Sequence, residues 1–397
     1  MPESALSEAV ALAAALPGIE VCFDTVVSIR KVAPGQFFGP GKLDEIKKQL
    51  KADHIELVFV DGPVTPVQQR NLEKAWGVKL LDRTGLILEI FADRAATREG
   101  VLQVELAALS YQRTRLVRAW THLERQRGGL GFVGGPGETQ IEADRRAIDE
   151  AITRIRRQLG KVTKTRALHR AARAKVPFPV VALVGYTNAG KSTLFNRLTG
   201  AGVLAQDQLF ATLDPTMRGV ELETGARVIL SDTVGFISDL PTQLVAAFRA
   251  TLEEVLAADL VLHVRDISHA ETEAQADDVH KILTELGVDE HTPMIEVWNK
   301  IDAVSDPESL ETIAARRAEI VAISALSGTG TSELVVEIGA ALDGARISEE
   351  MHLEFSQGRQ RAWLHDQKIV QDEAQDDTGW ALSLSWTARQ KSAFESL

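Results

Sequence analysis

The stretch Gly185-Tyr-Thr-Asn-Ala-Gly190-Lys191-Ser192 follows the apolar run Val180–Val184 and precedes a run of helix-forming residues. Its pattern, G-x-x-x-x-G-K-[ST], is typical of a loop that binds phosphates between a strand and a helix. The glycines let backbone N–H groups surround phosphate oxygens, Lys191 is expected to reach the β- and γ-phosphates, and the Ser192 hydroxyl is expected to coordinate Mg²⁺. Strands and helices alternate from here to about residue 343, which predicts an α/β fold with a doubly wound, mostly parallel sheet.

A second motif, Asp232-Thr-Val-Gly235, follows two predicted strands at 220–222 and 228–230. An aspartate at a strand end can hold the water shell of a metal ion, and a glycine leaves its backbone N–H free for the γ-phosphate. Between the two motifs lies Phe210-Ala-Thr212-Leu-Asp-Pro-Thr216. A threonine that senses the γ-phosphate must also reach Mg²⁺, and the residues alone leave both Thr212 and Thr216 as candidates.

Two further motifs predict recognition of the base. Asn299-Lys300-Ile301-Asp302 ends the apolar run 294–298, and Ser324-Ala325-Leu326 follows the apolar run 320–323. The Asp302 carboxylate can accept hydrogen bonds from N1–H and the 2-amine of guanine, a pair of donors that adenine lacks. A backbone N–H of the second motif can donate to the base oxygen. Each motif alone also fits a helix cap after a strand, but the order of all four predicts a guanine nucleotide.

The composition is typical of a globular chain with two or three domains, since 45% of its 397 residues are hydrophobic and 25% are charged. No apolar run approaches the length of a transmembrane helix. Glu8 and the lack of any Lys or Arg before Arg30 argue against a secretory signal. Cys22 is the only cysteine, which excludes an intramolecular disulfide and a cysteine-based zinc site. We therefore expect a cytoplasmic protein.

Charge is distributed unevenly along the chain, whose formal net charge is −12. Residues 112–175 include 16 basic and 6 acidic residues, a net charge of +10, so the remainder has 28 against 50, or −22. A basic segment in an acidic protein suggests a local contact with a polyanion such as RNA. The alternative is an ordinary solvated helix surface.

Four units are predicted along the chain. They are an N-terminal α/β domain at 1–98, a helical hairpin at 99–176, the nucleotide domain at 177–343 and a small α+β tail at 350–397. Apolar residues recur at helical spacing over 102–123 and 141–162, which predicts two long helices that pack along one seam. Between them, residues 128–137 include six glycines. Because glycine continues a helix at a cost, we expect the chain to turn back there, with a glycine-rich tip and basic flanks.

Longer stretches around these motifs resemble the HflX family, a group of translational GTPases in the Obg-like branch. The stretches are Asp82-Arg-Thr-Gly-Leu-Ile-Leu, Thr121-His-Leu-Glu-Arg-Gln, Gly134-Gly-Pro-Gly-Glu-Thr-Gln140, Gly185-Tyr-Thr-Asn-Ala-Gly-Lys-Ser-Thr193, Leu209-Phe-Ala-Thr-Leu-Asp-Pro215 and Asp232-Thr-Val-Gly-Phe-Ile237. The resemblance covers about residues 18–340, so the tail matches least. The glycine-rich tip looks one residue longer than the usual form of the family.

The resemblance implies a GTP hydrolase that binds the 50S ribosomal subunit and its rRNA near the peptidyl-transferase centre and splits 70S ribosomes under stress. It favours Thr212 over Thr216 as the metal ligand. Two other functions stay open, a regulatory nucleotide switch without ribosome splitting and a GTP-gated RNA-binding or assembly factor. We expect a monomer, and hydrolysis of ATP as well as GTP stays open.

The expected site residues fall into four groups. Catalytic roles are expected for Lys191, Thr212 and Gly235. Mg²⁺ is expected at Ser192 and Thr212, with Asp232 acting through water, and K⁺ at Asn188, because an asparagine at this place in related GTPases helps to bind that ion. Contacts with GTP are expected from Gly185, Tyr186, Thr187, Asn188, Ala189, Gly190, Lys191, Ser192, Thr193, Phe210, Ala211, Thr212, Leu213, Asp214, Asp232, Thr233, Val234, Gly235, Asn299, Lys300, Asp302, Ser324, Ala325 and Leu326. Contacts with ribosomal RNA are expected from Arg125, Arg127, Gly128, Gly129, Gly131, Gly134, Gly135 and Gly137.

The residues after Gly235 predict slow hydrolysis. Many small GTPases place a glutamine there, which orients the attacking water. Phe236 and Ile237 stand in its place and cannot polarise water, so we expect the ribosome to supply or order the missing element. Arg218 is chemically able to act as an internal arginine finger, although a solvated arginine is the more common role.

Overall fold

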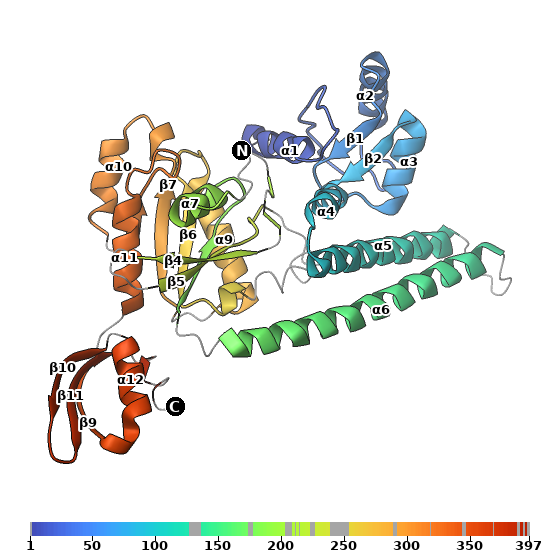
Figure 1. Cartoon of the computed structure of the whole chain (residues 1–397). Helices are drawn as coiled ribbons and strands as arrows, with labels where there is room; N and C mark the ends of the chain where they lie inside the picture. The colour runs from blue at the N-terminus through green and yellow to red at the C-terminus, as the bar shows by residue number, and fades with distance from the viewer. Residues whose placement is uncertain are drawn as a thin grey trace.

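The computed structural model describes residues 2–394 except 127–135, 174–177, 203–208, 211, 214, 223–226, 239–253, 289–291, 318, 344–346, 368, 387–389 and 392–393. Residues 2, 117–126, 136–141, 163–173, 343 and 347 are described by their backbone alone. Three sheets with their helices and one pair of long helices follow one another along the chain (Figure 1). Within the described residues, no helix combines the length and the apolarity that crossing a bilayer requires.

A six-stranded sheet forms the centre of the nucleotide domain. Its strands are ordered β4-β5-β3-β6-β7-β8, and every neighbouring pair is parallel except β4 with β5. Parallel strands of such a sheet end at one edge, so the loops that carry the four motifs meet there. The strands are β3 (Val180–Val184), β4 (Thr216–Glu221), β5 (Arg227–Asp232), β6 (Leu260–Asp266), β7 (Met294–Asn299) and β8 (Ile320–Ala322).

Helices cover both faces of this sheet. They are α7 (Lys191–Thr199), α9 (Thr272–Leu286), α10 (Pro307–Ala314) and α11 (Thr331–Asp343). Successive side chains of β3 point to opposite faces, so Ala182 joins a buried cluster with Val279 of α9, whereas Val181 joins another with Leu334 of α11. Burial on both faces explains why the central strands are almost continuously apolar.

The N-terminal unit contains a two-stranded parallel sheet and four helices. The elements are α1 (Pro2–Ala14), α2 (Pro40–Ala52), β1 (Leu57–Val60), α3 (Pro66–Trp76), β2 (Lys79–Asp82) and α4 (Arg83–Arg94). Thr65 and Gln68 form a capping box that starts α3, and Gly77, with φ 77°, ends it. Trp76 is buried and donates its indole N–H to the Leu43 carbonyl of α2 at 3.2 Å. Leu43, Leu72 and Trp76 belong to a buried cluster within this unit, whereas Leu12 of α1 and Phe91 of α4 belong to a cluster that also holds Ala182 of β3.

Two long helices, α5 (Arg98–Gln126) and α6 (Pro136–Arg173), lie side by side (Figure 1). Ile152 and Ile155 of the predicted seam are buried, and Arg113 pairs with Asp149 across it at 2.8 Å. The predicted apolar stripe of α5 runs through Leu102, Leu106 and Leu109. Val104 and Ala107 lie outside it, yet they are buried in the cluster that also holds Phe91 of α4. The helix α5 therefore has a second buried face, which the single stripe did not predict.

The C-terminal unit is an antiparallel sheet ordered β10-β11-β9 with one helix against it. Its elements are β9 (Ile347–Glu354), the short η2 (Phe355–Gln357), α12 (Gly358–Asp366), β10 (Val370–Gln375) and β11 (Gly379–Trp386). Leu364, Leu382 and the fully buried Trp386 build a separate core. The predicted fold class is thus confirmed in all its parts, from the small α/β unit through the hairpin and the parallel sheet to the α+β tail.

Candidate functional site

The loop between β3 and α7 depends on two glycines with positive φ. Gly185 has φ 149°, and a Cβ atom there would lie 2.1 Å from the Val264 carbonyl oxygen. Gly190 has φ 93°, and a Cβ atom there would lie 2.1 Å from Asn299 Nδ2. A side chain would displace the backbone of β6 at Gly185 and the Asn299 amide at Gly190, so both glycines allow the loop to lie tightly against its neighbours.

Lys191 begins α7 and lies fully inside the loop. Its ammonium group donates to the carbonyl oxygens of Tyr186 at 2.7 Å and of Gly185 at 3.1 Å. Burial lowers the pKa of Lys191 to about 8, against the opposing effect of the Asp232 carboxylate. Phosphate oxygens near this amine would favour its charged form. The site is therefore suited to an anion.

Three side chains meet beside Lys191. The hydroxyls of Ser192 and Thr212 lie 2.9 Å apart, and both donate to Asp232 Oδ2, at 2.7 and 2.9 Å. Two neighbouring ligands of an octahedral Mg²⁺, each at 2.0–2.1 Å, would lie roughly 2.9 Å apart. Thr216, the other candidate threonine, is the first residue of β4 and pairs with Asp232 in the sheet register. The hydroxyl that lies beside Ser192 is that of Thr212.

The Asp232 carboxylate supplies a direct test of whether this cluster suits a metal. It is buried, and its Oδ1 atom has no hydrogen-bond partner among the described residues. Burial raises the pKa of Asp232, while the hydrogen bond from Ser192 and the charge of Lys191 oppose that effect. A buried carboxylate oxygen needs a donor or a cation. A hydrated Mg²⁺ held by the two hydroxyls would provide one, so the residues fit this ion.

Asn299 joins the phosphate loop to the loop that is expected to bind the base. Its amide nitrogen donates to the Ala189 carbonyl at 2.8 Å, and its amide oxygen accepts from the Ala325 N–H at 2.9 Å. Asp302 follows within the short helical turn η1 (Ile301–Ala303), where it is exposed. Lys300, with φ 66°, places its amine 2.7 Å from Asp266 of β6. The motifs at the ends of β3, β7 and β8 are thus brought together.

Arg197, which the sequence analysis did not single out, holds the last of these loops. It lies on α7, and its Nε donates to the Ala325 carbonyl at 2.7 Å, while a second guanidinium nitrogen donates to the Leu326 carbonyl. The helix that begins at the phosphate loop therefore also positions the Ser324 motif, in which Ser324 is buried and Leu326 is 73% exposed. No local spacing signals this link, because the partners are more than a hundred positions apart.

The segment after β5 lies directly on the phosphate loop. Phe236 N–H donates to the Gly185 carbonyl at 3.1 Å, and Thr187 N–H donates to the Phe236 carbonyl at 2.7 Å. Gly235 precedes Phe236 and lies close to the phosphate loop. A Cβ atom at Gly235 would be 2.8 Å from Thr187 Cα and 2.9 Å from Lys191 Nζ. Phe236 and Ile237 are both buried. No side chain at these two positions can hold a water molecule by a hydrogen bond.

The other expected residues are placed as follows. Thr233 donates its hydroxyl to the Leu183 carbonyl at 2.5 Å, Asn188 is exposed with φ 60°, and Thr193 lies in the first turn of α7. Phe210, Leu213 and Val234 are buried, and Arg218 is exposed on β4. Ala211, Asp214, Arg127 and the tip glycines Gly128, Gly129, Gly131, Gly134 and Gly135 lie outside the described residues, and Arg125 and Gly137 are described by backbone alone.

Comparisons with known proteins find matches along most of the chain. Family models described as "GTP-binding GTPase N-terminal", "GTP-binding GTPase Middle Region", "50S ribosome-binding GTPase" and "HflX C-terminal domain" match residues 3–92, 94–173, 180–300 and 309–396. The GTPase HflX of Magnetococcus marinus is 53% identical over 353 residues, which is 89% of this chain and 81% of the relative. The chain belongs to the HflX family. The HflX match extends through the C-terminal tail, beyond the range that the motifs alone covered.

A second relative and a solved structure are also similar to the chain. The GTPase HflX of Escherichia coli is 44% identical over 363 residues, covering 91% of this chain and 85% of the relative. A crystal structure of a GTP-binding protein from Sulfolobus solfataricus with GDP is similar, with 24% identity, a TM-score of 0.44 and coverage of 85% of this chain and 94% of that one. As a member of the HflX family, the chain is a P-loop GTP hydrolase. HflX proteins belong to the GTPases, which generally use Mg²⁺ with the nucleotide.

Proposed function

We propose that this GTPase binds the 50S ribosomal subunit and separates 70S ribosomes, acting in the cytoplasm under stress. The observation that carries the proposal is the basic character of α5 and α6, whose segment 112–175 has a net charge of +10 in a chain of −12. RNA phosphates attract such a surface, and a narrow helix pair can enter an RNA cavity. The family model for residues 180–300, described as a 50S ribosome-binding GTPase, supports the same partner.

In the proposed nucleotide site, each of a few residues has a separate role in hydrolysis or binding. Lys191 would neutralise charge on the β- and γ-phosphates, and the Gly235 N–H would donate to the γ-phosphate. Ser192 and Thr212 would hold Mg²⁺, with Asp232 binding its water shell, and Asp302 would select guanine. When bound, the ion would supply positive charge that stabilises the charge developing on the phosphates. The hydroxyl pair at 2.9 Å supports the choice of Thr212.

Stimulation by the ribosome follows from what the site lacks. Phe236 and Ile237 are buried and apolar, so neither orients the attacking water. We propose that 50S binding orders that water or adds a polar group, and that K⁺ bound through the exposed Asn188 adds charge at the phosphates. Equal turnover in K⁺ and Na⁺ salts would remove the K⁺ assignment, and turnover unchanged by 50S subunits would remove the stimulation.

The parts of the chain take separate roles in this proposal. Residues 1–98 and the hairpin 99–176 would enter the 50S subunit near the peptidyl-transferase centre, with the glycine-rich segment 128–137 at the tip. Residues 177–343 would hydrolyse GTP, and the protein would act as a monomer.

Light scattering of 70S ribosomes gives the test. Adding the protein with GTP, or with a non-hydrolysable analogue, should lower the scattering as subunits separate. A variant lacking residues 128–137 should bind GDP normally but leave the scattering unchanged. Co-sedimentation with 50S without any drop in scattering would instead favour a GTP-gated RNA-binding factor. If the protein does not sediment with 50S subunits in the presence of any nucleotide, the hypothesis of a regulatory nucleotide switch is favoured. Competition of ATP with a labelled GTP analogue decides whether ATP is a substrate.

A further inference from the structure

The helix α4 of the N-terminal unit contacts both segments that surround the nucleotide site. Near its C-terminal end, Phe91 packs edge-on against Phe210, with ring centroids 4.7 Å apart and both side chains buried. Phe210 has φ 57° and lies two residues before Thr212. At the N-terminal end of α4, Arg83 donates to Ser238, which lies three residues after Gly235, through its carbonyl at 2.8 Å and its hydroxyl at 2.9 Å. One helix therefore touches the segments before Thr212 and after Gly235.

A compact polar cluster, here called the interdomain cluster, surrounds Arg83 and consists of Glu8, Arg83, Tyr186 and Ser238. Glu8 of α1 accepts from Arg83 at 2.5 Å, from the Ser238 hydroxyl at 2.6 Å and from the Tyr186 hydroxyl at 2.5 Å. The Tyr186 hydroxyl in turn accepts from the Ser238 N–H at 2.5 Å. Tyr186 is the second residue of the phosphate loop, so one carboxylate connects that loop, Ser238 and α4.

The interdomain cluster is largely withdrawn from solvent, and its one guanidinium pairs with two carboxylates. The Arg83 side chain is 9% exposed and also pairs with Asp61 at 2.6 Å, while the Glu8 side chain is 19% exposed. Burial alone would lower the pKa of Arg83, but the hydrogen bonds to Glu8 and Asp61 raise it overall. Burial next to Glu8 raises the pKa of Tyr186, which keeps its hydroxyl as a donor. Removing one charge from such a group leaves its partner buried without compensation.

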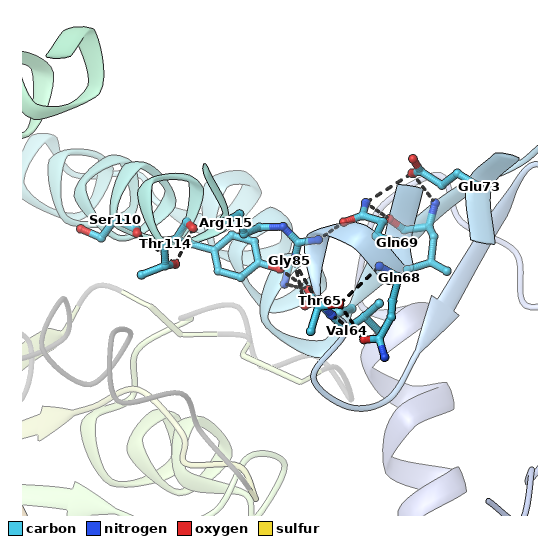
Figure 2. Close-up of polar contacts among 12 residues, drawn as sticks. Val64, Thr65, Gln68, Gln69, Glu73, Gly85, Ser110, Thr114 and Arg115 are labelled. Carbon is cyan, nitrogen blue, oxygen red and sulfur yellow. Dashed lines mark hydrogen bonds and ion pairs between the residues drawn. The ribbon is translucent and has the colours of Figure 1, made fainter. Parts of the chain in front are cut away.

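The residue before Arg83 connects α4 to the long helices. Asp82, the N-cap of α4, accepts from the Gly85 N–H at 2.9 Å, from the Tyr111 hydroxyl at 2.5 Å and from Arg115 at 3.1 Å. Figure 2 shows Arg115 reaching from α5 toward Gln69 of α3, to which it also donates. Asp82 thus binds Tyr111 and Arg115 of α5, whereas the next residue, Arg83, binds Ser238.

We propose that Glu8 and Arg83 are positioning residues for GTP hydrolysis, which hold the segment after Gly235 on the phosphate loop and make α4 and α5 respond to the bound nucleotide. Segments that contact the γ-phosphate change position between GTP and GDP states in GTPases. Because α4 touches both segments, its contacts differ between the GTP and GDP states. By thermodynamic linkage, changes in those contacts also change the affinity for the nucleotide. The inference depends on GTP hydrolysis alone and not on ribosome binding.

The described conformation sets the direction of the effect. Thr212 lies against Ser192 and Asp232, and Gly235 lies against Thr187 and Lys191, so the segments on both sides are closed over the site. The interdomain cluster therefore stabilises the closed arrangement. Losing it should lower kcat for GTP more than it changes KM, because Glu8 and Ser238 are not among the residues expected to bind the nucleotide.

Two variants and a matched control test this in the full chain without ribosomes. Glu8→Gln removes one charge of the interdomain cluster, Ser238→Ala removes one hydroxyl, and Glu3→Gln makes the same chemical change at an exposed position of α1. We expect kcat to fall roughly 10-fold in the first two variants, since small misplacement at a site is costly, and to stay unchanged in Glu3→Gln. The double variant should lose less than the product of the two single losses, because both changes act on one cluster.

Hydrogen exchange supplies a readout that a purely structural role would not move. Amides of α4 and the first turns of α5 should exchange at different rates with GDP and with a non-hydrolysable GTP analogue in the unaltered chain and in Glu3→Gln. That difference should vanish in Glu8→Gln and Ser238→Ala. If the difference persists, or if kcat is unchanged or rises in both variants, the proposal is overturned. If Glu8→Gln does not fold, kcat and the exchange difference of Ser238→Ala test the proposal on their own.

Discussion

Gly235 lies so close to the phosphate loop that it leaves no room for a side chain. A Cβ atom would be 2.8 Å from a backbone atom of Thr187 and 2.9 Å from the Lys191 amine. We expect Gly235→Ala to lower GTP turnover by roughly 100-fold, because it displaces the groups that meet the γ-phosphate, and to spare GDP binding. Gly219→Ala is the matched control, since a Cβ atom there meets nothing within 4 Å. Equal turnover in the two variants would contradict the role of Gly235.

Asp302 is expected to read the base, and its exchange for asparagine tests that role. Asparagine loses one acceptor for guanine but gains a donor that suits the 2-oxygen of xanthine. We expect Asp302→Asn to weaken GDP binding by roughly 100-fold, since hydrogen bonds to charged groups are among the stronger ones, and to bind xanthosine diphosphate better than the unaltered chain does. Titration with both nucleotides checks this. Asp306→Asn, a change at the exposed N-cap of α10, should alter neither affinity.

The four nucleotide motifs could be predicted from sequence because each one is local. In Gly185–Ser192, for example, a few neighbouring residues determine the loop conformation and the chemistry together. Arg83 could not be assigned in this way. It lies within a stretch that resembles the family, but its partners Glu8 and Ser238 are 75 and 155 positions away. Long-range pairs leave no spacing pattern in one sequence, so burial and contact had to come from the structure.

At the scale of elements, the strand β6 carries a buried histidine that makes stability depend on pH. Burial lowers the pKa of His263 to about 3, with His280, Arg265 and Lys191 adding to the effect. The unfolded chain binds a proton at His263 below pH 6.5, the ordinary value, whereas the native chain does not until about pH 3. The free energy of unfolding should therefore decrease as the pH is lowered from 6.5 to about 3, by at most about 1.4 kcal/mol per pH unit from this group.

His263→Gln should flatten that dependence in urea unfolding between pH 6.5 and pH 5. His54→Asn, at an exposed position with φ 53° that asparagine tolerates, should leave the slope as it is. A variant slope that equals the slope of the unaltered chain would show that His263 is protonated in the native protein as well.

Helices and strands were predictable where one periodicity dominated. The stripe of α6 predicted the burial of Ile152 and Ile155, which the structure confirms. The stripe of α5 was incomplete, because Val104 and Ala107 belong to a cluster with residues of α4 and with none of the described residues of α6. A helix with two partners spreads its apolar residues over a wider arc, so a search for a single seam finds only one of its faces.

For the whole molecule, the uneven charge predicts how binding to RNA depends on salt. Arg154 and Arg157 are exposed on α6, three positions apart and so on neighbouring turns of one face. Reversing both to glutamate should weaken co-sedimentation with 50S subunits and reduce its salt dependence, because fewer counterions are released from RNA phosphates. GTP binding should not change. Arg227→Glu, an exposed exchange on β5, is the matched control.

The separate core of the C-terminal unit makes its unfolding visible without any label. Three of the six tryptophans of the chain, Trp363, Trp380 and Trp386, lie in this unit, and Trp386 is fully buried there. Intrinsic fluorescence during heating should therefore include a component from the tail, while the signal of a labelled guanine nucleotide reports on the parallel sheet. If the two signals change at different temperatures, the last fifty or so residues melt as an independent cooperative unit.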